Sequence, residues 1–471
     1  MKICVLQPDY STTTVDYKNY DPPRNLTNLR PESDTVDHIF LNKLTTYKQL
    51  KDLSKSKYDI FINLCEGYLE WEVPSIDVIN TFELLNLPYT GPSAILYDPP
   101  KPLMKYVAYC AGIKTPNAIE INIREKINIG NLQFPLFVKP AKAGDSLGID
   151  EQSLVINESD LHKKITALQN EYDEILVEEY IAGREFTVLV AANTDGKTCV
   201  AYKPVEYVFP NDITFKTYAH KTSALYTDVN KPCEEEALAN ALKDGAQKIF
   251  TAFAGVGYAR LDFRVNDAGE IFFLEINFTC SVFYDNGYEG SADYILQNEE
   301  AGKAKFLQKI INEGIARHTR KQKNYVIKGN AVKGYGIFAT KDIAKDEIIF
   351  RGEEKAQRIV TKNYVTQNWN AEEKNNFKHY AYPISNEVYI LWDDNAENWA
   401  PQNHSCKVNT AYKGLNVVAI KPITIGEELS LDYAEFLDEN INSFTCNCGS
   451  VKCRGTIKGT KNNSVTFRES L

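Results

Sequence analysis

The stretch YARLDFRVNDAGEIFFLEIN (258–277) decides the fold of the first two-thirds of this chain. Its first half alternates between charged and apolar residues, which predicts a β-strand whose polar face carries Arg260, Asp262 and Arg264. NDAG (266–269) is typical of a turn, and the apolar run after it predicts a returning strand. The stretch therefore predicts a β-hairpin with one apolar and one polar face.

Oxygen-bearing side chains are expected to gather on the polar face of this hairpin. If the strands pair directly on either side of the turn, Arg260 lies opposite Glu275, and Asp262 lies opposite Phe273 and diagonal to Glu275. Asp262, Glu275 and Asn277 then converge, and hard oxygen ligands of this kind suit a Mg²⁺ ion that bridges nucleotide phosphates. The solvated face of an ordinary hairpin explains this stretch alone equally well.

A glycine-rich loop after another apolar strand points to phosphate. In FPLFVKPAKAGDSLGI (134–149), Lys139 ends the strand, and a loop with Gly144, Ser146 and Gly148 follows. Backbone amides of such a loop can cradle phosphate, and the lysine supplies a positive charge. One such loop is weak support by itself.

Two glutamates stand around a predicted strand–turn–strand in ILVEEYIAGREFTVLV (175–190). Glu178 and Glu185 have positions where carboxylates could accept hydrogen bonds from an adenine amine and a ribose hydroxyl. For these two residues alone, solvent-facing acids on a half-buried strand are the ordinary explanation.

Taken in order, these segments resemble the D-alanine–D-alanine ligase branch of the ATP-grasp superfamily, over residues 58–285. The other matching stretches are LPYTGPSA (87–94), PKPLMKYVAYCAGIKTP (100–116) and TFKTYAHKTS (214–223). The resemblance implies an ATP-grasp fold preceded by a Rossmann-like subdomain. It also implies that ATP phosphorylates a carboxylate and that an amine then attacks the acyl phosphate.

The resemblance assigns residues to the nucleotide and the metal. Lys101, Lys139 and the loop with Ser146 are assigned to the phosphates, and Lys221 resembles the lysine that reaches the γ-phosphate. Glu178 and Glu185 are assigned to adenine and ribose. The remaining assignments are the Mg²⁺ ligands Asp262, Glu275 and Asn277, and Arg260 as the cation beside the tetrahedral intermediate.

The stretches that would hold amino acids depart from the family pattern. FTCSVFYDNG (278–287) replaces the family's Ser-Pro-Gly-Met stretch, Asp145 replaces a loop serine, and CEGYLEWEVP (65–74) replaces a His-Gly-rich loop. These departures argue against D-alanyl-D-alanine as the product. The acids of the last stretch, at 66, 70 and 72, could face a cationic substrate or simply form a solvated loop.

Four cysteines near the C-terminus predict a metal site. Cys446 and Cys448 form a C-x-C pair, Cys453 follows after a short loop, and Cys406 supplies a fourth thiol. Four thiolates at this spacing are typical of a closed structural Zn²⁺ site. Free cysteines in a flexible tail are the alternative, and they explain three cysteines within eight residues poorly.

The last third of the chain resembles the SET domain with its cysteine-rich post-SET tail, over residues 326–458. The matching stretches are KGYGIFATKDIAKDEIIF (333–350), NHSC (403–406), KPITIGEELSLDY (421–433) and CNCGSVKCRG (446–455). The resemblance implies methylation of a lysine-like amine by S-adenosylmethionine. Val408 stands where the family usually has proline.

The SET resemblance also assigns residues. The S-adenosylmethionine site would be formed by Lys333, Tyr335, Gly336, Asn403 and His404. Tyr433 is assigned as the catalytic tyrosine, and Tyr412 is a weaker match for the amine channel. Taken alone, a core histidine and a buried packing tyrosine are the ordinary explanations of His404 and Tyr433.

Composition limits the function classes and the compartment. The chain is long enough for two or three domains, and 43% apolar with 25% charged residues is typical of a soluble globular protein. A formal charge of −10 argues against non-specific binding to nucleic acid or to an anionic membrane. No apolar run approaches the roughly 20 residues that span a bilayer, and the N-terminus MKICVLQPDY has no signal-peptide core. Because the other six cysteines are scattered singly, a reducing, cytoplasmic location is expected.

We therefore expect an α+β multidomain protein, in which an ATP-grasp fold with a Rossmann-like subdomain precedes a β-rich SET domain closed by zinc. The expected domains are 1–95 (Rossmann-like), 96–315 (ATP-grasp), 326–445 (SET) and 446–458 (post-SET). The expected cofactors are ATP, Mg²⁺, S-adenosylmethionine and Zn²⁺. The first functional hypothesis is a bifunctional ligase and N-methyltransferase for amino acid or peptide substrates. The alternatives are a protein lysine methyltransferase with an accessory ATP-binding module, and a non-catalytic ATP-binding platform.

Overall fold

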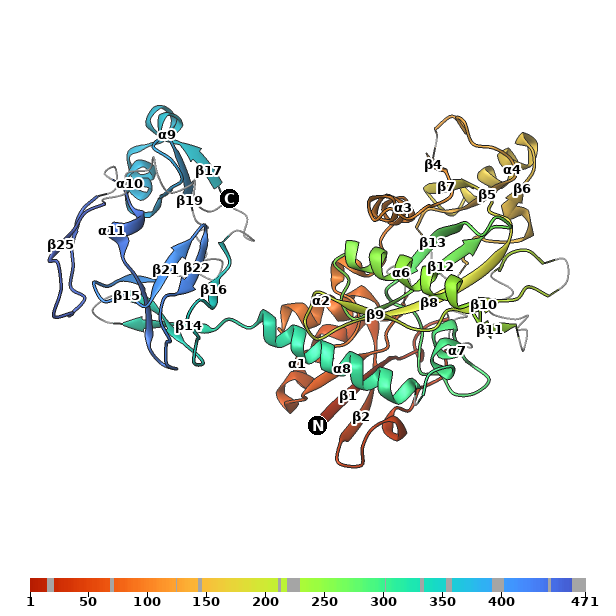
Figure 1. Ribbon diagram of the computed structural model, residues 1–471, viewed down its shortest axis with the longest axis horizontal. Helices are drawn as coiled ribbons and strands as arrows, with labels where there is room; N and C mark the ends of the chain where they lie inside the picture. Colours follow the sequence, from red (N-terminus) through yellow and green to blue (C-terminus); the bar gives the residue numbers. More distant parts are fainter. Residues whose placement is uncertain are drawn as a thin grey trace. The chain divides into compact units, whose positions relative to one another are not determined.

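The computed structural model describes the chain except residues 15–20, 68–71, 124, 143–145, 211–212, 218–228, 301, 331–333, 353–357, 392–401, 439–441 and 460–471. The chain divides into two compact units, Met1–Lys321 and Gln322–Leu471 (Figure 1). Among the described residues, no helix has the length and apolar character needed to cross a bilayer.

The first unit begins with a parallel sheet in the order β2-β1-β3. Its elements are β1 (Lys2–Pro8), β2 (Thr35–Leu41), β3 (Ile60–Asn63), α1 (Thr46–Leu53) and α2 (Ile76–Leu84). β1 pairs in parallel with both neighbours, and its residues 3–6 are completely buried. The apolar runs within residues 1–7 and 58–65 thus form buried strands of a parallel sheet.

Two antiparallel sheets follow. The first has the order β4-β7-β5-β6, and the second has the order β11-β10-β8-β12-β13 with β9 paired to β8. The strands of the first sheet are β4 (Ala118–Asn122), β5 (Leu136–Pro140), β6 (Leu154–Val155) and β7 (Glu174–Glu179). Those of the second are β8 (Arg184–Ala192), β9 (Cys199–Ala201), β10 (Val205–Tyr207), β11 (Asn230–Pro232), β12 (Tyr258–Val265) and β13 (Ile271–Asn277).

Helices cover these sheets through apolar stripes. The helices are α3 (Lys101–Cys110), α4 (Glu158–Leu168), α6 (Glu236–Ala252), α7 (Ser291–Gln297) and α8 (Gly302–Lys321). α4 packs on the first sheet, α3 and α6 pack on one face of the second, and α7 and α8 pack on its other face. Because side chains alternate along a strand, Val188 joins the α6 side and Leu189 the α8 side. α8 also packs on the N-terminal sheet and so joins the parts of this unit (Figure 1).

The predicted hairpin forms, but its predicted register is wrong. Asp262 lies opposite Glu275, not Phe273, and Arg260 lies opposite Asn277, not Glu275. The turn is longer than assumed: the backbone N–H of Asn266 donates to the carbonyl oxygen of Glu270, and Val265 lies opposite Ile271. A bulge then adds one more residue in β13. The bulge brings two carboxylates face to face.

The second unit consists of short strands, as its sequence predicts. Its sheets have the orders β14-β15-β23-β20, β16-β22-β21, β17-β19-β18 and β24-β25. The first two sheets comprise β14 (Tyr325–Asn330), β15 (Gly334–Ala339), β20 (Asn403–His404), β23 (Glu428–Leu431), β16 (Ile348–Phe350), β21 (Thr410–Lys413) and β22 (Asn416–Ala419). The others comprise β17 (Arg358–Thr361), β18 (Tyr382–Pro383), β19 (Val388–Leu391), β24 (Phe444–Thr445) and β25 (Thr456–Ile457). The helices are α9 (Lys362–Asn368), α10 (Ala371–Tyr380) and α11 (Tyr433–Phe436).

Candidate active sites

The first unit contains a polar pocket to which both antiparallel sheets contribute. Lys139 and Glu178 come from the first sheet, and Glu185, Asp262 and Glu275 come from the second. The pocket encloses about 790 Å³ of space, part of it open to solvent. Together with Ser146 and Arg260, seven of the residues predicted from sequence therefore line one pocket.

Glu178 is the buried centre of this pocket. Its Oε1 lies 2.5 Å from Lys139 Nζ and its Oε2 lies 2.6 Å from Lys105 Nζ. Burial raises the pKa of Glu178, but the two lysines outweigh burial and lower this pKa to about 2. Glu178 is therefore an anion that can accept hydrogen bonds.

Glu185 is held in the same way by two cations. Lys216 Nζ lies 3.0 Å from its Oε1, and Arg264 Nη2 lies 3.1 Å from its Oε2. Burial raises the pKa of Glu185, and Lys216 with Arg264 lowers it more, so that the net pKa shift is downward. Arg264 is fixed in turn by the hydroxyl of Tyr180, at 2.8 Å.

Lys105, Lys216 and Arg264 were not predicted from the sequence as residues of this site. Arg264 stood on the predicted polar face of the hairpin, and Lys105 follows Lys101 by four residues in a helix, which places the two on one helix face. The strand position of Arg264 and the helical spacing of Lys105 were the sequence signals that could have identified them. Their partner glutamates lie on other strands, so the pairings required the tertiary structure.

An aromatic wall completes the pocket. The Phe137 ring lies 5.1 Å from that of Phe215 and 6.2 Å from that of Tyr180, centroid to centroid, and all three residues line the pocket. Aromatic faces beside hydrogen-bond acceptors suit a planar heterocycle such as adenine.

The metal-ligand candidates lie at the hairpin. Asp262 and Glu275 are paired across β12 and β13, and both side chains line the pocket. Asn277 follows two residues after Glu275 on the same strand but is not among the described residues that line the pocket. Lys101 Nζ lies 3.7 Å from Glu275 Oε2. Two facing carboxylates with an amide oxygen nearby fit the oxygen ligands that Mg²⁺ prefers.

Arg260 is bound to one of these carboxylates. Its Nη2 lies 2.9 Å from Asp262 Oδ2 and its Nε donates to Asp262 Oδ1 at 3.1 Å. Burial lowers the pKa of Arg260, but Asp262, Cys280 and Glu275 together raise it more, so Arg260 remains a fixed cation that lines the pocket.

The predicted phosphate loop is described only in part. Ser146 lines the pocket with a left-handed φ of 60°. Gly144, Asp145 and Lys221 lie outside the described residues.

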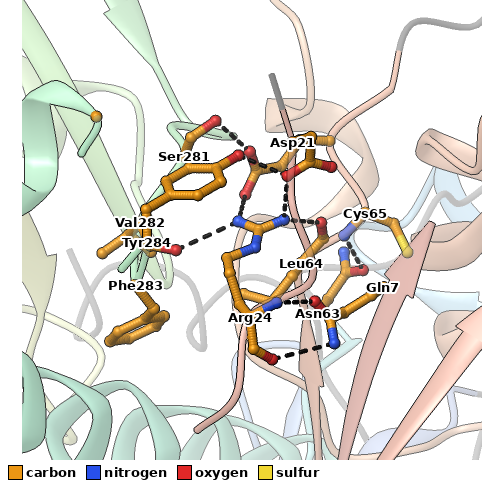
Figure 2. A network of polar contacts seen from close by, with 12 residues as sticks. Gln7, Asp21, Arg24, Asn63, Leu64, Cys65, Ser281, Val282, Phe283 and Tyr284 are labelled. Atoms are coloured by element: carbon orange, nitrogen blue, oxygen red, sulfur yellow. Dashed lines mark hydrogen bonds and ion pairs between the residues drawn. The ribbon is translucent and has the colours of Figure 1, made fainter. Parts of the chain in front are cut away.

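The two stretches that depart from the family pattern meet at a second polar network (Figure 2). Ser281 Oγ donates to Glu66 Oε2 at 2.6 Å, which directly joins the loop after β13 to the end of β3. Arg24 lies 3.4 Å from Glu66 Oε1 and donates to the carbonyl oxygens of Leu64 and Val282, at 3.0 and 3.2 Å.

The same network continues to Asp21. Arg24 Nη2 lies 3.1 Å from Asp21 Oδ1, which also accepts the Tyr284 hydroxyl at 2.6 Å (Figure 2). The guanidinium of Arg24 lies over the Tyr284 ring, 4.6 Å from its centroid. Glu66 was a candidate from the sequence, whereas Asp21, Arg24 and Tyr284 match no motif and were not predicted.

In the second unit, Gly336 and Asn403 lie side by side. Asn403 Nδ2 donates to the backbone oxygen of Tyr335 at 3.1 Å and to Glu428 Oε1 at 2.8 Å. A Cβ on Gly336 would lie 2.7 Å from Asn403 Nδ2 and 2.9 Å from Glu428 Oε1, so a larger residue here would displace these two side chains. Tyr335 is exposed at 72%, and Lys333 lies outside the described residues.

His404 contacts Tyr433 directly. Its Nδ1 accepts the Tyr433 backbone N–H at 3.2 Å, and the two ring centroids lie 5.6 Å apart. Burial lowers the pKa of His404, which favours the neutral ring that this bond requires. Phe444 packs against both rings, at 5.5 and 5.8 Å.

Three tyrosines gather beside this contact. The Tyr433 hydroxyl donates to the backbone oxygen of Gln402 at 2.5 Å, and the Tyr382 and Tyr412 rings lie 5.0 Å apart. Burial raises the pKa of Tyr412, and Tyr382 and Tyr433 raise it further. Tyr382 was not selected from sequence, because it lies in no matched stretch.

The four cysteines converge as predicted. The sulfur atoms of Cys406, Cys446, Cys448 and Cys453 all lie within 4.8 Å of one another. The N–H of Cys406 donates to Cys448 Sγ at 3.5 Å, and this bond with one from Ser450 lowers the pKa of Cys448 to about 6. Burial raises the pKa of Cys446 to about 12. Four clustered sulfurs with N–H donors fit a structural Zn²⁺ ion.

Each of the two units resembles a known protein family. Residues 105–282 match the family described as D-ala D-ala ligase C-terminus, and residues 334–434 match the SET domain. The D-alanine–D-alanine ligase of Syntrophotalea carbinolica is 35% identical over 201 residues, which cover 41% of this chain and 61% of that protein. The D-alanine–D-alanine ligase of Enterococcus hirae is 30% identical over 257 residues, which cover 51% of this chain and 67% of that protein.

The chain thus spans less than two-thirds of the Syntrophotalea relative. Among solved structures, the D-alanine–D-alanine ligase from Bacillus anthracis complexed with ATP is 21% identical, with a TM-score of 0.49. That alignment covers 68% of this chain and 99% of the solved chain. By its similarity to the Enterococcus protein and to both families, this chain belongs to the D-alanine–D-alanine ligase family of ATP-grasp proteins, and its second unit contains a SET domain.

Proposed function

We propose that this chain is a bifunctional enzyme, with an ATP-dependent carboxylate–amine ligase in residues 96–315 and an S-adenosylmethionine-dependent N-methyltransferase in residues 326–458. One observation carries the ligase proposal. Acids and bases from five strands of two sheets line one pocket, among them Lys139, Glu178 and Glu185. A non-catalytic platform has no need of the facing carboxylates Asp262 and Glu275 or of a buried Arg260.

In the ligase, Glu178 and Glu185 accept hydrogen bonds from the adenine amine and the ribose hydroxyls, and Phe137 and Tyr180 contact the base. Lys101, Lys139 and Lys221 neutralise the phosphates. When the nucleotide binds, Lys139 weakens its ion pair with Glu178 and contacts a phosphate. The flexible lysine side chain permits this movement.

Asp262, Glu275 and Asn277 would hold Mg²⁺, which neutralises charge on the transferring phosphoryl group. The substrate carboxylate oxygen takes the γ-phosphoryl group, and ADP leaves. The nitrogen of a neutral amine then attacks the acyl carbon, phosphate leaves, and the nitrogen loses one proton to the departing phosphate to give the amide, while Arg260 stabilises the oxyanion.

The substrates are proposed to be amino acids or peptides other than a D-alanine pair. Ser281 lies in the loop that replaces the family's stretch for the second carboxylate, and its hydroxyl already donates to Glu66. A substrate carboxylate beside Ser281 would be repelled by the carboxylate of Glu66. We therefore favour an amine donor with a cationic side chain.

In the methyltransferase, the backbone at 333–336, with Tyr335 and Gly336, would contact S-adenosylmethionine together with Asn403 and His404. Tyr382, Tyr412 and Tyr433 form an aromatic wall, and desolvation beside it would lower the pKa of an entering ammonium. The deprotonated nitrogen attacks the sulfonium methyl, and the thioether leaves. Alignment of the amine by Tyr433 supplies most of the rate.

The two activities are proposed to act on one molecule, because fusion raises the concentration of one module's product at the other site to about millimolar. The second candidate is a protein lysine methyltransferase with an accessory nucleotide-binding module. The SET domain favours it, since SET domains act on protein lysines. The negative charge of the chain argues against nucleic acid as a partner.

One experiment separates the candidates. The protein is incubated with ATP, Mg²⁺, S-adenosylmethionine and a pool of free amino acids, and the products are analysed by mass spectrometry. Tyr433→Phe should give ligated but unmethylated product, and Lys139→Ala should leave at most methylated free amino acid. If both variants leave a methylated protein lysine as the only altered product, the small-molecule proposal fails and the second candidate replaces it.

A further inference from the structure

Arg454 directly follows the last cysteine of the cluster and contacts two other segments of the second unit. Its backbone N–H donates to Cys406 Sγ at 3.4 Å. Its guanidinium donates from Nη2 to Asp432 Oδ1, the residue before Tyr433. One residue therefore touches a cysteine of the cluster and the neighbour of the tyrosine assigned to catalysis.

Asp432 fixes the start of the helix that carries Tyr433. It is the N-cap of α11, and its Oδ1 accepts the backbone N–H of Ala434 at 3.1 Å. The same oxygen accepts from Arg454. One oxygen of Asp432 therefore joins the cysteine segment to the first turn of α11.

A second route connects the same two places. His404 Nε2 lies 3.5 Å from Cys406 Sγ, and His404 Nδ1 accepts the Tyr433 backbone N–H at 3.2 Å. Together the two routes form a closed ring of contacts through Cys406, Arg454, Asp432, Tyr433 and His404. A closed ring restrains Tyr433 from both sides of its backbone.

We propose that Arg454 is a positioning residue of the methyltransferase site, which couples the metal-bound state of the cysteine cluster to the placement of Tyr433. The proposal rests on the methyltransferase function above. The Arg454 side chain is 43% exposed and Asp432 is 13% exposed, and an ion pair this open adds little to stability. Its effect is instead expected in alignment, where a displacement of about 1 Å can cost about 100-fold in rate.

The test compares Arg454→Met and Arg454→Lys with Lys452→Met, which removes an exposed cation from the same segment. Three quantities are measured on the full chain: zinc content, the Kd for S-adenosylmethionine, and hydrogen exchange of residues 432–436. Wild-type protein from which a chelator has removed zinc is the reference for α11 without the proposed coupling to the metal site.

We expect Arg454→Met to retain about one zinc per chain while residues 432–436 exchange as fast as in the chelated wild type. Its Kd for S-adenosylmethionine should rise about tenfold, Arg454→Lys should restore part of the protection, and Lys452→Met should match the wild type. The proposal is overturned if Arg454→Met keeps the slow exchange of the wild type, if it loses its zinc, or if the wild type holds no zinc. If the wild type binds no S-adenosylmethionine, the proposed methyltransferase fails, while the exchange comparison still decides the role of Arg454.

Discussion

Lys139 Nζ lies 2.5 Å from Glu178 Oε1, at the point where a nucleotide is proposed to bind. Lys105 holds the other oxygen of the same carboxylate, and all three side chains are at least 90% buried. The group is costly to desolvate, because burial lowers the pKa of Lys105 while the lysines lower that of Glu178. Because these side chains are ionised, the stability of the folded protein depends on pH.

The first prediction concerns acid stability. The pKa of Glu178 is about 2 in the folded protein and 4.5 as a reference, so its ionised form stabilises the fold fully above about pH 4.5. This contribution is lost as pH falls from about 4.5 toward 2. We expect the free energy of unfolding in urea to decrease less between pH 5 and pH 3 in Glu178→Gln than in the wild type. Glu171→Gln removes an exposed acid and should behave as the wild type does; equal slopes for Glu178→Gln would contradict the assignment.

The second prediction concerns the facing carboxylates. Glu275→Gln removes one of two charges that would hold Mg²⁺, so substrate-dependent ADP release should be abolished. Binding of S-adenosylmethionine should remain, because that site belongs to the other unit. Glu270→Gln at the exposed end of the hairpin is the matched control and should keep full ADP release. Survival of ADP release in Glu275→Gln would show that the metal lies elsewhere.

The third prediction concerns zinc. Protein purified without chelator should contain about one zinc per chain, and Cys448→Ser should lose both the metal and the fold of the C-terminal segment. Metal analysis and circular dichroism measure the two effects. Cys110→Ser, an exposed cysteine outside the cluster, should change neither. Absence of zinc from the wild type would exclude this site.

The fourth prediction concerns the network of Figure 2. Arg24→Met leaves Asp21 and Glu66 without their shared cation in a buried place, and the loss should be about 3 kcal/mol of unfolding free energy. ADP release that depends on amino acids should fall more than nucleotide affinity does, because the network joins the two loops outside the nucleotide pocket. Lys55→Met breaks an exposed ion pair and should cost less than about 1 kcal/mol in urea unfolding. A comparable loss of nucleotide affinity in Arg24→Met would contradict this separation.

The sequence by itself determined the elements and the classes of chemistry. The alternation around Asp262 predicted the hairpin, and the spacing of Cys446, Cys448 and Cys453 predicted the sulfur cluster. Both signals are local, since the period of a strand and the reach of a short loop depend on neighbouring residues alone.

Only the tertiary structure decided the partners of these residues. A longer turn and a bulge in β13 together placed Asp262 opposite Glu275, and no local pattern marks where a bulge occurs. Arg264 pairs with Glu185 on another strand, and Arg24 donates to the carbonyl oxygen of Val282, which is 258 residues away in the sequence. Such contacts depend on how sheets pack and how loops meet, so their residues match no motif even where they complete the site.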